Sequence, residues 1–318
     1  MIQRPSLTVV VPTYRRPTAL HRCLNGVLEH TRAAQTDGLA DVAPVLVIDN
    51  DPDGGARSAV EIYGAEVRYV HEPVPGIAAV RARALREVTT RLLSFIDDDE
   101  VPCAGWLPEL LATWEQSRPA AVVGRVISVY DGDVHPWLTT ADLFGRVRKP
   151  TGTLVPQAAA GNLLLDADWV HGHQLTFDLR LGLGGGEDNL FSRALVAAGG
   201  DIVWCDESVA EDHVPADRAT LRWLMKRVFS QGHASVAVDL LAAHGDAAAA
   251  GRIRLRAVVA GVGRILVGAP RLVAGVLARS DHRSGLAVRL VVRGAGMVWA
   301  GFGVTHHEYA RVARVGVR

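Results

Sequence analysis

The stretch Phe95-Ile96-Asp97-Asp98-Asp99-Glu100 decides the fold of this chain. It starts at the end of an apolar run, residues 92–96, and changes within one residue to four consecutive acids. An apolar run without polar alternation is typical of a strand that is buried on both faces of a parallel sheet. We therefore expect the acids at the carboxyl end of a central strand, where open α/β sheets bind their ligands.

Two earlier runs repeat this arrangement. Residues 7–11 lead into Pro12-Thr13, and residues 45–48 lead into Asp49-Asn50-Asp51. The segments between the runs predict a helix over residues 18–31 with Thr18 as its N-cap, a strand over residues 66–70 and a helix over residues 78–88. Strands that alternate with helices predict an α/β fold with a mostly parallel, doubly wound, Rossmann-like sheet.

The alternation continues less clearly after residue 100. It predicts helices over residues 106–116, 187–198 and 219–241, and strands over residues 121–129, 160–165 and 202–205. Residues 131–157 contain many glycines and prolines and predict long loops. A soft boundary lies near residues 245–251, so we expect a catalytic domain over residues 1–245 and a helical extension over residues 246–318.

The acids of residues 97–100 indicate a metal site. Four adjacent carboxylates repel one another unless a positive charge lies among them. Mg²⁺ and Mn²⁺ prefer oxygen ligands and are commonly held by one or two carboxylates together with substrate phosphates. The alternative is a solvated acidic turn, but the position directly after a buried strand favours the metal site.

A glycine loop followed by two acids, Gly182-Leu183-Gly184-Gly185-Gly186-Glu187-Asp188, precedes the predicted helix over residues 187–198. Such a loop can act as a mobile lid that carries a general base. The alternative is a capping pair, because the helix dipole stabilises acids in a first helical turn.

A third group, Asp212-His213-Val214-Pro215, is followed by Arg218, Arg222 and Arg227. These arginines recur at about one-turn spacing, so a helix would place them on one face, where they could bind phosphates. The alternatives are a surface or capping histidine and a solvated arginine face.

Taken together, these stretches resemble the family 2 glycosyltransferases of the GT-A fold. The resemblance is to the bacterial members that build exopolysaccharides and cell-surface or secondary-metabolite glycans, and it covers about residues 7–230. It rests on five motifs in order: VVVPTYRRP (9–17), VIDN (47–50), PGIAAVR (75–81), FIDDD (95–99) and GGED (185–188). The ordered set is far more specific than any single motif.

The resemblance implies that the first motifs bind the nucleotide. Thr13 and Asp49 match positions that contact the nucleotide base, with Pro12 beside them, and Arg81 matches the basic residue that joins them there. Ala82 departs from the pattern, because many relatives have Asn after the arginine. This departure leaves the detail around the nucleotide open.

The resemblance also implies that Asp97 and Asp99 form a DxD motif. Asp97 is expected to face the ribose of the nucleotide. Asp99 is expected to bind the Mn²⁺ or Mg²⁺ ion that contacts the diphosphate. Asp98 lies between them and is expected to assist in nucleotide-sugar binding. His213 matches a histidine that completes the metal site in some members.

The acidic pair after the glycine loop is expected to carry the catalysis. Asp188 matches the catalytic base, and Glu187 beside it matches an acceptor contact. Arg218 and Arg222 are less standard in the family, and their expected role is binding of the diphosphate.

The implied reaction is an inverting transfer from a nucleoside-diphosphate sugar, in the first place a UDP sugar. Asp188 removes the proton of an acceptor hydroxyl as it attacks the anomeric carbon, and the nucleoside diphosphate leaves from the opposite face. The metal on Asp99 neutralises the charge that develops on the diphosphate. A single displacement of this kind needs no covalent intermediate. The expected acceptor is a glycan, a lipid-linked sugar or a small metabolite.

Two other functions fit parts of the pattern. A nucleotidyltransferase shares the sheet and the acidic ligands, but it normally has a glycine-rich phosphate loop after the first strand, where this chain has PTYRRP (12–17). A membrane-associated scaffold with a degenerate transferase domain would have lost the DxD motif or the acidic pair. Both are present.

The charge of the chain is divided unevenly. The 318 residues contain 34 Lys+Arg and 34 Asp+Glu, but residues 251–318 hold twelve arginines, no lysine and two acids. Arg256, Arg264, Arg271 and Arg279 recur about every two helical turns among aliphatic residues, and Pro270 is expected to kink or split this helix.

Such basic amphipathic helices favour contact of residues 251–318 with an anionic membrane surface. Nucleic acid is not an expected partner, because the tail lacks lysine and has few interleaved aromatic residues. The alternative is a helical pair that packs on the catalytic domain or on a second subunit.

Composition excludes several classes of protein. A hydrophobic content of 49% with 21% charged residues excludes a disordered chain. Three distant cysteines without a CxxC motif argue against a disulfide framework or a cysteine zinc site. We expect no signal peptide, and no uncharged apolar run reaches the ~18–20 residues of a spanning helix. The expected location is therefore cytoplasmic, peripheral at the inner face of the membrane where the tail binds lipid.

Overall fold

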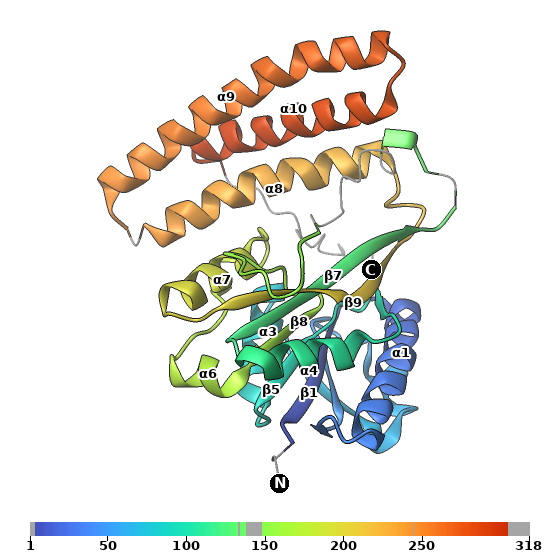
Figure 1. Ribbon diagram of the computed structural model, residues 1–318. Coiled ribbons are helices and arrows are strands. Elements are labelled where there is room, and N and C mark those ends of the chain that lie inside the picture. Colours follow the sequence, from blue (N-terminus) through green and yellow to red (C-terminus); the bar gives the residue numbers. More distant parts are fainter. Residues whose placement is uncertain (1–3, 133, 138–147, 244, 305–318) are drawn as a thin grey trace, which may run out of the picture. The chain divides into compact units, whose positions relative to one another are not determined.

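The structure is a computed structural model that describes residues 4–132, 134–137, 148–243 and 245–304. The chain forms two compact units (Figure 1). The sheet unit comprises Met1–Val134, Phe144–Leu179 and Glu187–Ala219, and the helical unit comprises His135–Leu143, Arg180–Gly186 and Thr220–Arg318. Part of the predicted loop region, residues 133 and 138–147, and the end of the predicted extension, residues 305–318, lie outside the described residues.

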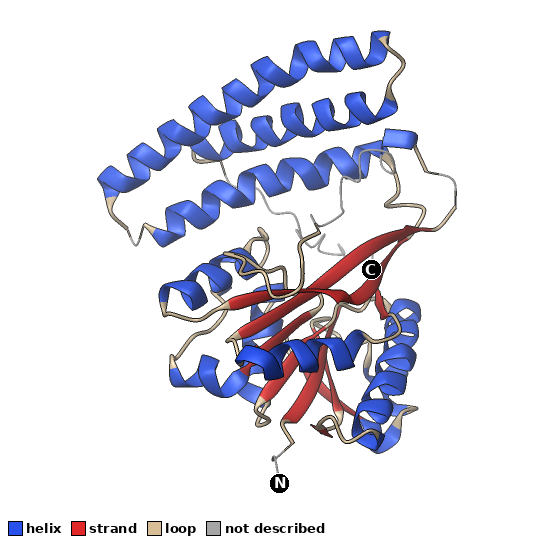
Figure 2. Cartoon of the chain, viewed as in Figure 1, coloured by secondary structure: helices blue, strands red, loops and turns tan. Residues whose placement is uncertain are grey.

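The sheet unit is built on one nine-stranded sheet (Figure 2). Its strands are β1 (Ser6–Thr13), β2 (Asp41–Val42), β3 (Val45–Asp49), β4 (Val67–His71), β5 (Leu92–Phe95), β6 (Glu100–Pro102), β7 (Ala121–Tyr130), β8 (Leu163–Asp166) and β9 (Ile202–Val214). The order is β4-β3-β1-β5-β8-β7-β9-β6, and β2 pairs with β1. The β4-β3-β1-β5 part and the β7–β9 pair are parallel, whereas β8 and β6 run antiparallel to their neighbours. The predicted mostly parallel sheet is confirmed.

Helices cover both faces of this sheet, because its central strands bury side chains on both sides. They are α1 (Pro17–Thr36), α2 (Arg57–Glu61), α3 (Ile77–Glu87), α4 (Trp106–Ser117), α6 (Ala167–Gly172) and α7 (Glu187–Ala197). In β1, Val9 and Val11 belong to the core under α1 and α4, and Val10 belongs to the core under α3 and α7. This alternation within one apolar run is the doubly wound arrangement that the sequence predicts.

The start of α1 corrects one expectation. Thr18 is not the N-cap but lies inside the helix, since Pro17 occupies the first helical position and Arg16 precedes it without a capping hydrogen bond from its side chain. Proline is favoured at this position because its missing N–H has no partner there and its fixed φ suits the helix.

The last strand, β9, is much longer than the predicted residues 202–205 and runs to Val214. It pairs in parallel with β7, with an irregularity between Gly124 and Arg125. Asn162 fills this irregularity: its amide nitrogen donates to the carbonyl oxygens of Arg125 and Ser208 at 2.9 and 3.1 Å. The extension of β9 carries His213 toward the acids of residues 97–99.

Three long helices form most of the helical unit: α8 (Leu221–Ala242), α9 (Ala247–Leu277) and α10 (Asp281–Gly301), and α10 packs against both α8 and α9 (Figure 1). The predicted domain boundary at residues 245–246 falls inside this unit, between α8 and α9.

Glycines let these helices approach backbone to backbone. A Cβ atom on Gly261 of α9 would lie 2.6 Å from the carbonyl oxygen of Gly294 of α10. Gly232 of α8 and Gly296 of α10 meet the opposite backbone in the same way. Small residues at helix crossings permit this close approach.

Pro270 does not split α9, which runs unbroken from Ala247 to Leu277, so that half of the expectation is wrong, and the expected kink stays a prediction. The residue is exposed, and α9 contacts α10 on both sides of it, at Gly268 and at Gly275. Packing on both sides holds the helix continuous across the hydrogen bond that proline cannot make.

Candidate active site

The carboxyl ends of β1, β3 and β5 bring several predicted site residues to one edge of the sheet. β1 and β3 are parallel, with Thr13 opposite Asp49 and the buried Pro12 opposite Ile48. β5 lies on the other side of β1. Asp97, two residues after the end of β5, therefore lies at the same edge as Thr13.

Asp98 is buried, and side chains of the protein bond to both of its oxygens. Thr13 Oγ1 donates to Oδ2 at 2.8 Å, and Arg16 Nη1 donates to Oδ1 at 2.9 Å. Burial raises the pKa of Asp98 to about 6, against the lowering effect of the Arg16 charge. Asp98 thus ties the acidic loop to the end of β1.

Asp99 lies between two arginines. Arg16 Nη1 donates to its Oδ2 at 2.5 Å, and Arg218 Nη1 donates to the same oxygen at 3.4 Å. The side chain of Asp99 is 21% exposed, so solvent still reaches it. The structure therefore places the predicted Arg218 at the DxD motif, together with Arg16.

His213 lies beside Asp99 through strand pairing. Its backbone amide donates to the carbonyl oxygen of Asp99 at 2.9 Å, and its imidazole Nε2 lies 3.7 Å from the Glu211 carboxylate. Carboxylate oxygens with one imidazole are donor types that Mn²⁺ accepts, so these residue types fit a divalent metal. Within the described part of the chain, no three acidic, His or Cys side chains gather closely enough to hold an ion. A metal at Asp99 would take the place of Arg16.

Arg81 joins the DxD loop to the acidic pair of α7. It lies on α3 and is buried; Nη2 donates to Asp97 Oδ1 at 3.2 Å, and Nη1 pairs with Glu187 Oε1. The family resemblance implies that Arg81 joins Thr13 and Asp49 at the nucleotide base, and this role stays a prediction. In the structure Arg81 lies between Asp97 and Glu187. A guanidinium can reach two carboxylates at once because its donors form a planar fork.

Glu187 and Asp188 open α7 and differ in exposure. Glu187 is buried, and this burial raises its pKa to about 7 against the lowering effect of Arg81. Asp188 is half-buried, and its Oδ1 accepts a hydrogen bond from the amide of Asn189 at 2.7 Å. The first turn of a helix stabilises both carboxylates, and of the two Asp188 is the more accessible.

Comparison with known proteins assigns the family. The model of Glycosyl transferase family 2 matches residues 8–168, just over half of the chain, which include β1, β3, Arg81 and the DxD motif. The chain belongs to glycosyl transferase family 2. It is therefore a glycosyltransferase.

Among curated proteins, this family 2 glycosyltransferase is similar to the Succinoglycan biosynthesis protein ExoM of Rhizobium meliloti (strain 1021). The two are 32% identical over 243 residues, which cover 75% of this chain and 77% of the relative. Identity at this level over most of both chains supports the same family assignment.

Solved structures show the same fold. S. aureus TarS 1-349, solved in complex with UDP-GlcNAc, covers 89% of this chain and 90% of its own at a TM-score of 0.53 and 13% identity. GalNAc-T7, solved with UDP, GalNAc and Mn²⁺, covers 72% of this chain and 48% of its own at a TM-score of 0.52 and 14% identity. These likenesses confirm the predicted GT-A fold.

Asp49 of this glycosyltransferase is fully buried, and hydrogen bonds within the protein occupy its carboxylate. The amides of Asp51 and Ala56 donate to it at 2.8 and 2.9 Å, and the Tyr69 hydroxyl donates at 3.0 Å. Burial and this bond to Asp49 raise the pKa of Tyr69 to about 12. The observed bonds hold the loop after β3, and contact of Asp49 with a nucleotide base stays a prediction.

Two predicted elements belong to the helical unit. Arg222 lies in the first turn of α8, and its binding of a diphosphate stays a prediction. The glycine loop packs on α8, because a Cβ atom on Gly186 would lie 3.0 Å from Val238 Cγ2. The φ of Gly186 is +91°, a conformation that favours glycine. Movement of this loop as a lid also stays a prediction.

The adjacent arginines after β1, Arg15 and Arg16, belong to the first motif, but no role at the site was predicted for them. Arg16 bonds to Asp98 and Asp99, and Arg15 Nε donates to Asp51 Oδ1 at 2.9 Å. The left-handed backbone at Arg15, with φ of 54°, accompanies the divergence of the two side chains. The available signal was two adjacent arginines at the end of a strand next to the one that carries the acids.

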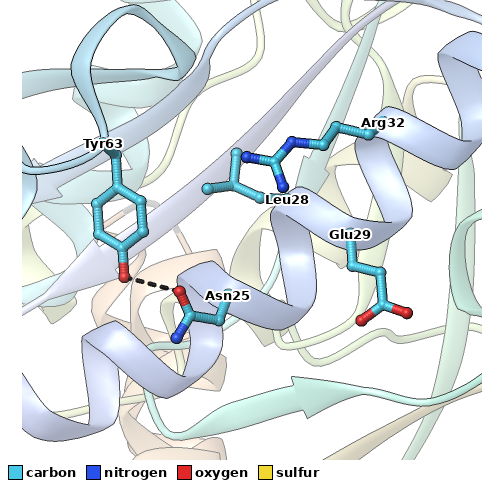
Figure 3. A pocket seen from close by; sticks show the side chains of 5 residues that line it. All are labelled: Asn25, Leu28, Glu29, Arg32 and Tyr63. Carbon is cyan, nitrogen blue, oxygen red and sulfur yellow. Dashed lines mark hydrogen bonds between the residues drawn. The ribbon is translucent and has the colours of Figure 1, made fainter.

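A surface hollow of about 470 Å³ lies elsewhere on the sheet unit (Figure 3). It is lined by Asn25, Leu28, Glu29, Arg32 and Tyr63. The Tyr63 hydroxyl donates to Asn25 Oδ1 at 3.0 Å across it. None of the predicted site residues lines this hollow, so it is separate from the candidate active site.

Proposed function

We propose that this glycosyltransferase moves a sugar from a UDP sugar to a hydroxyl of a glycan or lipid-linked acceptor, with inversion and with a divalent metal ion. The Arg81 bridge carries the proposal, because it joins Asp97 to Glu187 and so brings the DxD loop next to the acidic pair of α7. Donor phosphates bound at the DxD loop then lie next to an acceptor hydroxyl bound at the acidic pair of α7. The UDP-GlcNAc bound by TarS supports UDP as the nucleotide.

Asp188 is the proposed general base. It is half-buried at the start of α7, whereas its neighbour Glu187 is enclosed and paired with Arg81. Asp188 takes the proton of the acceptor hydroxyl while the oxygen bonds to the anomeric carbon. The bond from that carbon to the diphosphate breaks on the opposite face, and its electron pair leaves with the diphosphate. Glu187 positions Arg81.

The charge of the leaving diphosphate is met by cationic groups around Asp99. Arg16 and Arg218 both reach this carboxylate and can turn to phosphate oxygens, which guanidinium groups bind well. Asp99 and His213 are the residues that would hold Mn²⁺ or Mg²⁺, which would supply Lewis-acid stabilisation of the same charge.

The acceptor is proposed from the relatives. ExoM is a succinoglycan biosynthesis protein, which supports a growing polysaccharide over a small metabolite as the acceptor. We place acceptor selectivity in residues 131–180, a loop-rich stretch that is described only in part. A lipid-linked acceptor would make contact of residues 251–318 with the cytoplasmic face of the membrane useful.

A screen of nucleotide sugars with Mn²⁺ or Mg²⁺, read by release of the nucleoside diphosphate in the presence of acceptor, tests the proposal. Asp188→Asn should keep donor binding and lose about 100-fold or more of the transfer rate, because a general base contributes at least this factor. Asp168→Asn, an exposed acid in the first turn of α6, is the matched control and should transfer normally. Normal transfer by Asp188→Asn would overturn the base assignment.

A further inference from the structure

Helix α9 of the helical unit exposes large apolar side chains to solvent and buries small residues. The residues that α9 buries are Ala257, Gly261, Gly268 and Gly275, all of them small. A Cβ atom on Gly268 would meet the backbone of Ala287 and the side chains of Leu290 and Val291 in α10. The contact of α9 with α10 therefore rests largely on backbone and small residues, with Val258 and Ile265 beside Gly301 and Gly294 of α10. The exposed valines and leucines of α9 lie on another part of the helix surface.

Six of the eight large aliphatic residues that α9 exposes form one line. The α9 stripe consists of Leu255, Val259, Val262, Leu266, Val273 and Leu277. These positions are separated by 4, 3, 4, 7 and 4 residues, which places them within about 60° on a helix and along about 33 Å of its length. Leu255, Leu266 and Leu277 are 66%, 69% and 79% exposed. Soluble proteins rarely expose a continuous apolar surface of this extent.

Positive charge surrounds the stripe. Residues 247–301 contain nine arginines, no lysine and one acid, Asp281. None of the arginines falls on the stripe: helical geometry places Arg252 and Arg256 beside it and Arg264 and Arg271 on the far side of α9. An apolar line with flanking arginines complements lipid chains and anionic headgroups.

We propose that the α9 stripe docks on an anionic lipid bilayer, with α9 lying along its surface. This deepens, and rests on, the proposed transfer to a glycan or lipid-linked acceptor. By length and composition α9 could also span a membrane, since a window of 18 residues reaches a mean hydropathy of 1.6. Arg264 and Arg271 lie toward the middle of the helix, where a spanning segment tolerates charge poorly, and this favours the surface orientation.

The positive charge beside the α9 stripe also argues against a second copy of the chain as the partner that binds there. Pairing of two stripes would bring together Arg252 and Arg256 of both copies, with no acid in α9 to compensate them, and like charges at an interface oppose association. Anionic lipid headgroups would instead neutralise the charge of these arginines.

Flotation of the purified full chain with vesicles tests the proposal. The chain should float with vesicles of phosphatidylcholine mixed with phosphatidylglycerol, and less with phosphatidylcholine alone. Leu255→Gln, Leu266→Gln and Leu277→Gln together should weaken binding about tenfold or more, because they remove the inserted side chains without a change in charge. The matched control replaces Ile62, Leu154 and Leu179, equally exposed residues of the sheet unit, with Gln and should float like wild type.

Unchanged flotation of the stripe variant would overturn the docking surface. Absence of flotation by wild type, with a dimer that the stripe variant makes monomeric, would assign the stripe to a second copy instead. Resistance of the bound protein to extraction at alkaline pH would assign a spanning helix. Release of nucleoside diphosphate is measured on the same samples, so loss of donor turnover with intact flotation would count against the proposed function alone.

Discussion

Arg81 holds two carboxylates of the candidate site together from a buried position on α3. Glu187 is buried as well, which raises its pKa to about 7, and the positive charge of Arg81 opposes this shift by favouring the ionised carboxylate. A buried ion pair is expensive to break from one side, because the remaining charge has no compensation. The bridge therefore links the stability of the site to pH.

Arg81→Met is expected to destabilise the protein more at pH 8 than at pH 5. Burial already raises the pKa of Glu187 above the 4.5 of an unfolded chain, and loss of Arg81 raises it further. A raised pKa means that stability is full below about 4.5 and is lost as pH rises through the folded pKa. Thermal unfolding at the two pH values measures this. Arg22→Met, at an exposed arginine of α1, is the control, and an equal loss at both pH values would contradict the role of Glu187.

Asn162 is a second residue whose position in the fold few other side chains could occupy. It is fully buried with a left-handed φ of 55°, accepts a hydrogen bond from Trp106 Nε1 at 2.8 Å and donates to two backbone carbonyls. Asn162→Ala should lower the free energy of unfolding by about 3 kcal/mol, because it leaves several buried groups without partners. Urea unfolding measures the loss, with Asn25→Ala on the exposed face of α1 as the control. A loss below that of the control would contradict the prediction.

Some site residues were predictable from sequence and others were not. Asp97, Asp98 and Asp99 stand out because a strand buried on both faces stops at a run of acids. The position of Arg16 was not predictable, since it depends on the left-handed backbone at Arg15 and on which of two adjacent arginines turns toward the acids. Such side-chain directions are set by the tertiary structure.

At the scale of elements, helices α9 and α10 depend on glycine. Gly261 and Gly263 lie two residues apart in α9 but differ in surroundings: a Cβ atom on Gly261 would meet the backbone of Gly294, and one on Gly263 meets nothing within 4 Å.

Gly261→Ala should therefore destabilise the helical unit by about 1–2 kcal/mol, because the added methyl group forces the helices apart. Gly263→Ala should stabilise it by roughly 0.5–1 kcal/mol, because alanine loses less backbone entropy in a helix. The midpoint of thermal unfolding, followed by helical circular dichroism, compares the two variants. Shifts of the same sign would contradict the close packing of α9 on α10.

Helices and strands with an uninterrupted hydrophobic pattern were predicted well, and those whose hydrophobic pattern is broken by polar residues were not. The valine-rich run of residues 7–11 and the helix of residues 106–116 match β1 and α4 closely. The strand predicted over residues 202–205 stops short of the observed β9, since the following Asp206, Glu207 and Ser208 interrupt the apolar run. Pairing with β7 extends the strand across these polar residues, and a local pattern does not contain that partner.

At the scale of the molecule, the donor and the metal should act on stability together. A ligand that binds only the folded state at 100 times its Kd adds about 2.7 kcal/mol. We expect a UDP sugar with Mn²⁺ to raise the melting temperature of wild type, and either component alone to raise it less, because Asp99 is otherwise paired with Arg16.

Asp99→Ala should lose the joint effect of donor and metal. Asp53→Asn, at an exposed acid that pairs with Arg15, should keep it. A thermal-shift titration of the three proteins makes the comparison, and a full shift in Asp99→Ala would place the metal elsewhere.

The path of the chain limits how the helical unit can be removed. The unit is assembled from three separate stretches, and its short central stretch, Arg180–Gly186, packs on α8 through Gly186 and Val238. Cutting the chain after residue 219 would strip this glycine loop of its support just before Glu187 and Asp188. A shortened enzyme that lost activity would then have lost the support of its glycine loop as well as the proposed membrane contact. The two contributions can be separated only by single substitutions in the intact chain.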